Sequence, residues 1–79
     1  MKAKIYVTLK KDVLDPQGST VQRSLHQMGY TTVCSVRVGK FLEVEMDEPD
    51  AAKAKARIDE MCRKLFVNPN IEHYHFDLV

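Results

Sequence analysis

The sequence predicts an α+β fold in which two helices cover one face of a four-stranded antiparallel sheet, in the order β-α-β-β-α-β. Apolar and polar residues alternate strictly over residues 3–10, and alternation returns over residues 73–78. Between them, two segments that contain Asp and Pro each precede apolar residues at helical spacing. The 79 residues leave room for one core, so residues 1–79 are expected to form a single domain.

The first strand is expected to direct Ala3, Ile5, Val7 and Leu9 to one face. The first helix is expected to start at Asp15-Pro16, because aspartate accepts hydrogen bonds from free N–H groups at a helix start and proline suits the first helical position. Gly18 lies in the first turn, where glycine costs up to about 1 kcal/mol relative to alanine, so we expect a close approach to the backbone there. Gly29 is placed to end the helix in the left-handed conformation. The inward stripe is expected to be Val21, Leu25 and Met28.

Residues 32–47 are predicted to form a hairpin with a three-residue turn at residues 39–41. With that turn, Val36 and Val38 stay in phase with the apolar residues that follow, which are Leu42, Val44 and Met46. Gly39 would supply the unusual backbone angle of the turn. Val33 is out of phase with Val36, which indicates a bulge or a strand start near Cys34.

The second helix is expected to follow Asp47-Glu48-Pro49-Asp50, because acidic residues are favoured at a helix start. Its inward stripe is expected to be Ala51, Ala54, Ile58, Met61 and Leu65, with Cys62 beside it. Asn68-Pro69-Asn70 then breaks the chain. The last strand is expected to alternate Tyr74, Phe76 and Leu78 with His73, His75 and Asp77.

This element order, with right-handed crossovers, is that of the ferredoxin-like sandwich. Its first and third strands are neighbours, so lysines of the first strand are expected to face Glu43 and Glu45 on the third. The pairing accounts for the uneven charge: residues 1–40 carry seven Lys or Arg and two Asp, whereas residues 41–79 carry five Lys or Arg and nine Asp or Glu. The outward face is more apolar than a solvated face needs, which favours a subunit interface. The candidates are Tyr6, Phe41 and Ile71.

The size and the cysteine content favour a self-associating protein of the cytoplasm. A chain this short buries only about 60–65% of its unfolded surface, so association is an expected source of stability. Two cysteines do not make a disulfide framework, and the sequence has no secretory leader or membrane-length apolar run. We expect a dimer or a tetramer.

No set of residues predicts catalysis or metal binding. His73 and His75 share one side of a strand, but His26 and Cys62 are expected on helices across the sheet, so no metal site is predicted. Val38-Gly39-Lys40 lacks the remaining residues of a phosphate loop. Glu43 and Glu45 on one of the two central strands would repel nucleic-acid phosphates, and neither a nucleic-acid nor a membrane partner is expected. An enzyme of acylphosphatase type would need an anion-binding loop and a placed Arg–Asn pair, and the sequence has neither.

Four segments, in this order, resemble those of one known family. They are Leu9-Lys10 with Val13-Leu14-Asp15-Pro16-Gln17-Gly18, Leu25 to Gly29-Tyr30, Val36-Arg37-Val38-Gly39-Lys40, and Leu65 to Asn68-Pro69 with Ile71-Glu72. Together they resemble the PurS family, the small third subunit of phosphoribosylformylglycinamidine synthase in purine biosynthesis. The resemblance covers nearly the whole chain.

The resemblance implies a non-catalytic subunit that self-associates and joins two others. One partner would be a glutaminase that releases ammonia, and the other a synthetase that uses ATP. This chain would bind no cofactor of its own, whereas the assembled enzyme would use ATP and Mg²⁺. The implied partner-contact candidates are Asp15, Gln17, Gly18, Arg37, Lys40 and Asn68. The alternative is a ferredoxin-like dimeric regulatory domain that binds a small molecule.

Overall fold

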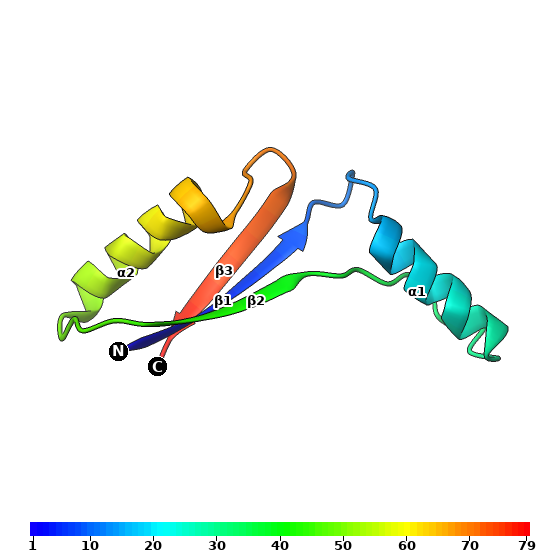
Figure 1. The fold of residues 1–79 in the computed structure, drawn as a ribbon, viewed down its shortest axis with the longest axis horizontal. Helices are drawn as coiled ribbons and strands as arrows, with labels where there is room; N and C mark the ends of the chain where they lie inside the picture. The colour runs from blue at the N-terminus through cyan, green and yellow to red at the C-terminus, as the bar shows by residue number, and fades with distance from the viewer.

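The computed structural model describes residues 1–79 as an elongated molecule of 49 × 25 × 14 Å. Its elements are β1 (Lys2–Leu9), α1 (Pro16–Gln27), β2 (Lys40–Glu45), α2 (Ala51–Met61), the π-helical turn η1 (Cys62–Phe66) and β3 (Glu72–Leu78). The strands form an antiparallel sheet in the order β2-β1-β3. One helix, α2, packs on this sheet, whereas α1 projects away beyond its end (Figure 1). None of the helices is long and apolar enough to cross a membrane.

The predicted pairing of the first strand with the glutamate-bearing strand is confirmed. Lys2 lies opposite Glu45 and Lys4 lies opposite Glu43. Lys2 Nζ forms an ion pair with Glu43 Oε2 at 3.0 Å, and this hydrogen bond to Glu43 raises the pKa of Lys2. The charges of the two halves therefore meet across neighbouring strands, as the sequence indicated.

The core lies between β1 and the helix α2. Side chains at every second position of β1 meet the buried stripe of α2; these core residues are Ala3, Ile5, Val7, Ala54, Ile58 and Cys62, with Val67 at the edge. Asp50 caps α2 by accepting hydrogen bonds from the N–H groups of Ala52 and Lys53. Only nine of the 79 residues are buried, so the chain by itself has a small core.

The prediction that α1 packs on the sheet is wrong. The side chains of its expected inward stripe are solvent-accessible, with Val21 42% and Met28 70% exposed. The two connections of α1, residues 10–15 and 33–39, carry it past the end of the sheet (Figure 1). Helical spacing showed that α1 is amphipathic, but it could not show which surface covers the apolar stripe.

The predicted hairpin at residues 32–47 is also wrong. The chain does not turn at residues 39–41; β2 begins at Lys40, and residues 33–39 pair with no strand (Figure 1). Gly39 serves close packing instead, because a Cβ there would lie 2.5 Å from the carbonyl oxygen of Val7. A single chain therefore forms three strands with one helix on the sheet, and the four-stranded ferredoxin-like sandwich is not reproduced.

The second helix follows its predicted stripe from Ala54 to Cys62, whereas Ala51, also expected inward, is exposed, and beyond Cys62 the helix departs from the stripe. The η1 turn has a wider hydrogen-bonding pattern than an α-helix, which rotates the residues that follow. Leu65, expected inward, is 78% exposed, and Val67 enters the core instead at 6% exposure.

Candidate functional site

The connection between the sheet and α1, here called the neck, consists of residues 10–15 and 33–39. Asp15 is its central side chain and is only 5% exposed. Its Oδ1 accepts a hydrogen bond from the N–H of Gly18 and its Oδ2 accepts one from the N–H of Val38, both at 2.8 Å. These two hydrogen bonds, with a smaller contribution from the Arg37 charge, lower the pKa of Asp15. Asp15 therefore both caps α1 and ties it to the 33–39 segment.

The first helix lies directly against the 33–39 segment. A Cβ on Gly18 would sit 2.1 Å from the carbonyl oxygen of Val36, which confirms the predicted close approach. Farther along α1, Gln22 Nε2 donates to the carbonyl of Cys34 at 2.8 Å, and His26 Nε2 donates to that of Val33 at 2.7 Å. Side-chain contacts thus hold the segment along the length of α1.

Arg37 is bonded within its own chain. Its guanidinium donates to the carbonyl oxygens of Lys10 at 2.7 Å, Val13 at 3.1 Å and Leu9 at 3.4 Å. These contacts hold the two halves of the neck together. Because the predicted hairpin tip does not exist, Arg37 lies beside the end of β1 and not at the tip of a turn.

Lys40 and Asn68 belong to a second connected group beside the neck. Lys40 Nζ donates to the carbonyl of Phe66 at 3.1 Å and lies 3.6 Å from Glu72 Oε2. Glu72 Oε1 accepts a hydrogen bond from the N–H of Asn68 at 2.7 Å. Gln17 is exposed, and its side chain makes no hydrogen bond within the chain. Of the six predicted partner-contact residues, five thus take part in internal packing or hydrogen bonding.

The outer face, the side of the sheet opposite α2, carries a row of rings across all three strands. Tyr6 on β1 stacks on His75 of β3 with ring centroids 4.6 Å apart, and its centroid lies 5.1 Å from that of Phe41 on β2. Phe41 is 53% exposed. Two of the predicted interface residues therefore adjoin, whereas Ile71 lies outside the row, just before β3. Sequence analysis did not place His75 in this row of rings. Alternation predicts which face of the sheet His75 lies on, but it does not predict which residue of β1 lies opposite it.

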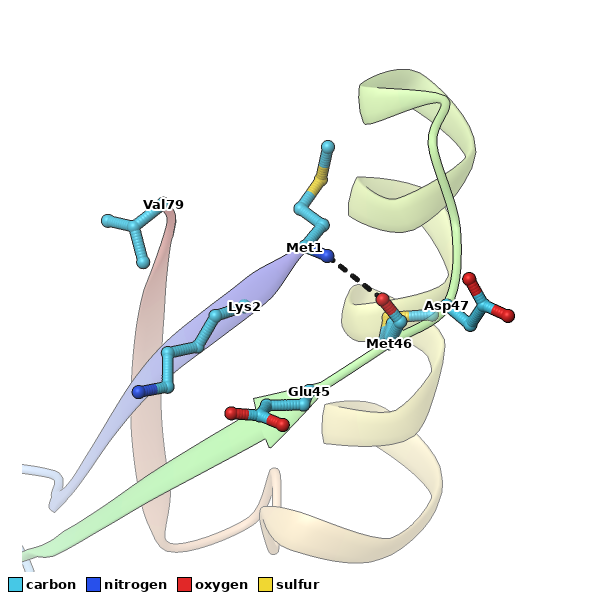
Figure 2. Close-up of a pocket in the computed structure, with 6 residues that line it drawn as sticks. All are labelled: Met1, Lys2, Glu45, Met46, Asp47 and Val79. Carbon is cyan, nitrogen blue, oxygen red and sulfur yellow. Dashed lines mark hydrogen bonds between the residues drawn. The ribbon is translucent and has the colours of Figure 1, made fainter.

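A shallow hollow lies at the opposite end of the sheet from the neck (Figure 2). It is lined by Met1, Lys2, Glu45, Met46, Asp47 and Val79. The amino group of Met1 donates to the carbonyl oxygen of Met46 at 2.9 Å, and Lys2 is already paired with a glutamate. The contacts in this hollow join the ends of β1 and β2.

Of the two free cysteines, Cys34 is exposed and Cys62 is buried. Burial raises the pKa of the Cys62 thiol, which disfavours the nucleophilic thiolate. Tyr74 donates its hydroxyl hydrogen to Asp59 Oδ1 at 2.5 Å, and this bond raises the pKa of Tyr74. No three His, Cys, Asp or Glu side chains lie close enough together to hold a metal ion.

Comparison with known proteins decides which family this architecture represents. The model of the PurS family, described as phosphoribosylformylglycinamidine (FGAM) synthase, matches residues 2–79. The chain belongs to the PurS family. A PurS subunit of phosphoribosylformylglycinamidine synthase from Synechocystis is 47% identical over 75 residues, which span 95% of this chain and 75% of that protein.

Solved PurS structures have the same fold. PurS of Methanocaldococcus jannaschii, one of the subunits of formylglycinamide ribonucleotide amidotransferase in the purine biosynthetic pathway, is 39% identical. It aligns with a TM-score of 0.84 over 96% of this chain and 92% of that chain. A chain in the PurLQS structure from Thermotoga maritima is 31% identical and aligns with a TM-score of 0.89, over 99% of this chain and 95% of its own length. The chain is therefore a PurS-family subunit of FGAM synthase in purine biosynthesis, which confirms the predicted family and function.

Proposed function

We propose that this chain is an assembly subunit of FGAM synthase, which self-associates and joins a glutaminase subunit to an ATP-using synthetase subunit. The observation that carries this proposal is the match to a chain of the Thermotoga maritima PurLQS structure along almost its whole length. In this role the chain binds no cofactor, and ATP and Mg²⁺ are used by the partner subunits. A cytoplasmic location fits a subunit of purine biosynthesis.

The character of the surface supports this role. Exposed apolar side chains occur on two separate parts of the molecule, the stripe of α1 and the row of rings on the outer face. Exposed apolar patches of this kind are typical of protein–protein interfaces. Two separate surfaces allow one copy of the chain to contact a second copy and a different subunit at the same time. Holding the partners side by side would help to keep ammonia from escaping between the two reactions.

Reconstitution tests the proposal. The glutaminase and synthetase subunits are combined with and without this chain, and FGAM formation is measured with glutamine and, separately, with ammonia as the nitrogen source. We expect glutamine-dependent turnover to require the chain and ammonia-dependent turnover by the synthetase to persist without it. Equal glutamine-dependent turnover in its absence would contradict the proposal.

A further inference from the structure

A cleft of about 890 Å³, here called the neck cleft, lies beside the end of β1 from which the chain leads to α1 (Figure 1). Three cationic side chains line it, those of Lys10, Lys11 and Arg37, together with the imidazole of His73 and one carboxylate, that of Asp12. Only one of its lining residues is apolar. Pockets that bind small molecules have volumes of roughly 300–1,000 Å³, so the cleft is large enough for a ligand, and its lining favours an anion.

The guanidinium of Arg37 is already fixed in place within this cleft. Its three hydrogen bonds to carbonyl oxygens all use Nη2, whereas Nη1 and Nε form no hydrogen bond within the chain. The nearby Asp15 carboxylate is bonded to the N–H groups of Gly18 and Val38 and not to the guanidinium. A cationic group that is held before binding loses little conformational entropy when a ligand arrives. Arg37 therefore presents two free N–H-bearing nitrogens to an anion.

The other charged side chains of the neck cleft have no ionic partner. Lys10, Lys11 and Asp12 take part in no ion pair, whereas three other lysines of the chain do. The cleft thus gathers three positive charges and a single negative one, apart from His73. Unpaired charges of one sign in one cleft repel one another and attract an ion of the opposite sign.

We propose that the neck cleft binds a small molecule that carries a phosphate or diphosphate group, held by Arg37, Lys10 and Lys11. A phosphate dianion neutralises three positive charges and one negative, whereas a single carboxylate does not. Phosphate oxygens also match a guanidinium fork beside the point charges of two lysines. The inference goes beyond the proposed function, in which this chain binds no cofactor, because the ligand is an effector of the subunit and not a reactant.

Titration of the native protein with pyrophosphate tests the inference. Backbone amide signals are followed by NMR at constant ionic strength, with chloride as the balancing anion. We expect shifts at residues 10–12, Arg37 and His73 that saturate below about 10 mM, and none at Lys53 or Lys55, which are exposed on α2. Shifts that do not saturate, or that are equally large at the α2 lysines, would show unspecific attraction and would overturn the inference.

Three substitutions of exposed residues change the charge in a matched way. Lys11→Ala removes a positive charge from the cleft, Lys53→Ala removes one from α2, and Asp12→Asn removes the only carboxylate of the cleft. We expect Lys11→Ala to weaken pyrophosphate binding about three- to tenfold, Asp12→Asn to tighten it about threefold, and Lys53→Ala to leave it unchanged. The amide spectrum shows that each variant is folded. Equal weakening by Lys11→Ala and Lys53→Ala would overturn the inference.

Two further anions test the chemical class of the ligand. Citrate carries several carboxylates on a small molecule, and a glutamate-rich peptide imitates an acidic segment of a partner protein. We expect pyrophosphate and ADP to bind the neck cleft more tightly than either of them. Equal or tighter binding of citrate would mean that charge alone is recognised, and equal or tighter binding of the peptide would assign the cleft to a protein partner. Either result would overturn the inference, and neither bears on glutamine-dependent turnover in the reconstituted enzyme.

Discussion

At the scale of single residues, a carboxylate and a glycine hold the neck together. Asp15 accepts hydrogen bonds from two backbone N–H groups that lie 20 positions apart in the sequence, those of Gly18 and Val38. Gly18 allows α1 to approach the backbone of Val36 more closely than any side chain would permit. The angle between sheet and helix therefore depends on very few atoms.

The Asp15 carboxylate makes the stability of the neck dependent on pH. Its pKa is lower in the folded chain than its ordinary value of 3.8, so the ionised form stabilises the fold above that value and the contribution is lost as the pH falls through the folded pKa. Urea unfolding between about pH 6 and pH 3 should show a steeper loss of stability for the native chain than for Asp15→Asn. Equal pH dependence of the two proteins would contradict the assigned role.

Replacing Gly18 by alanine is expected to destabilise the protein, whereas the same substitution at an ordinary helix position stabilises it. Gly to Ala within a helix normally stabilises by up to about 1 kcal/mol. Here the added methyl group would collide with the carbonyl of Val36, so Gly18→Ala is expected to lower the free energy of unfolding by about 1–3 kcal/mol. Urea denaturation measures the difference, and a stabilised variant would show that the segment moves aside at no cost.

Arg37 is a predicted partner-contact residue, and in the structure its guanidinium bonds to carbonyl oxygens of its own chain. Arg37→Ala should lower the free energy of unfolding of the isolated chain by about 1 kcal/mol. Three carbonyl oxygens would lose the guanidinium as their hydrogen-bond donor and would bond to water instead. Arg37→Lys is the control, since a lysine keeps the charge without the planar fork. A loss of partner binding in Arg37→Ala with no loss of stability would return the residue to a purely intermolecular role.

At the scale of elements, local signals were enough to predict most boundaries but not the tertiary partners. The start of α1 at Asp15-Pro16 and the left-handed Gly29, with φ of 99°, followed from local chemistry. The pairing of β1 with β2 was predicted from the usual strand order of the fold, and the opposite charges on the two strands fit it. The location of α1 could not be predicted, because its stripe is covered by nothing in the chain itself, and the hairpin at Gly39 was inferred from a glycine that serves close packing instead.

The wider hydrogen-bonding pattern of η1 leads to a paired prediction for the second helix. Ile58 is fully buried, so Ile58→Ala should lower the free energy of unfolding by about 2–5 kcal/mol. Leu65 is predicted by simple helical spacing to be equally important, yet it is exposed, and Leu65→Ala should change stability by less than about 0.5 kcal/mol. Similar losses for the two variants in urea denaturation would show that the α-helix continues through residue 65.

At the scale of the whole molecule, the core is small and large apolar surfaces are exposed. A single chain therefore leaves much of its apolar surface for other proteins to cover. Cys62 is buried and Tyr74 is hydrogen-bonded to Asp59, whereas many large apolar side chains outside the small core are exposed. In the proposed role, this chain supplies contact surface within FGAM synthase and its partner subunits carry out the chemistry.

Titration of the chain into fixed amounts of the glutaminase and synthetase subunits is the most direct measurement. A subunit that acts by assembly must be present in every complex, so the rate of glutamine-dependent FGAM formation should rise linearly and saturate at a fixed stoichiometric ratio. A maximal rate reached with a small fraction of that ratio would mean that the chain turns over as a catalyst and would contradict the account.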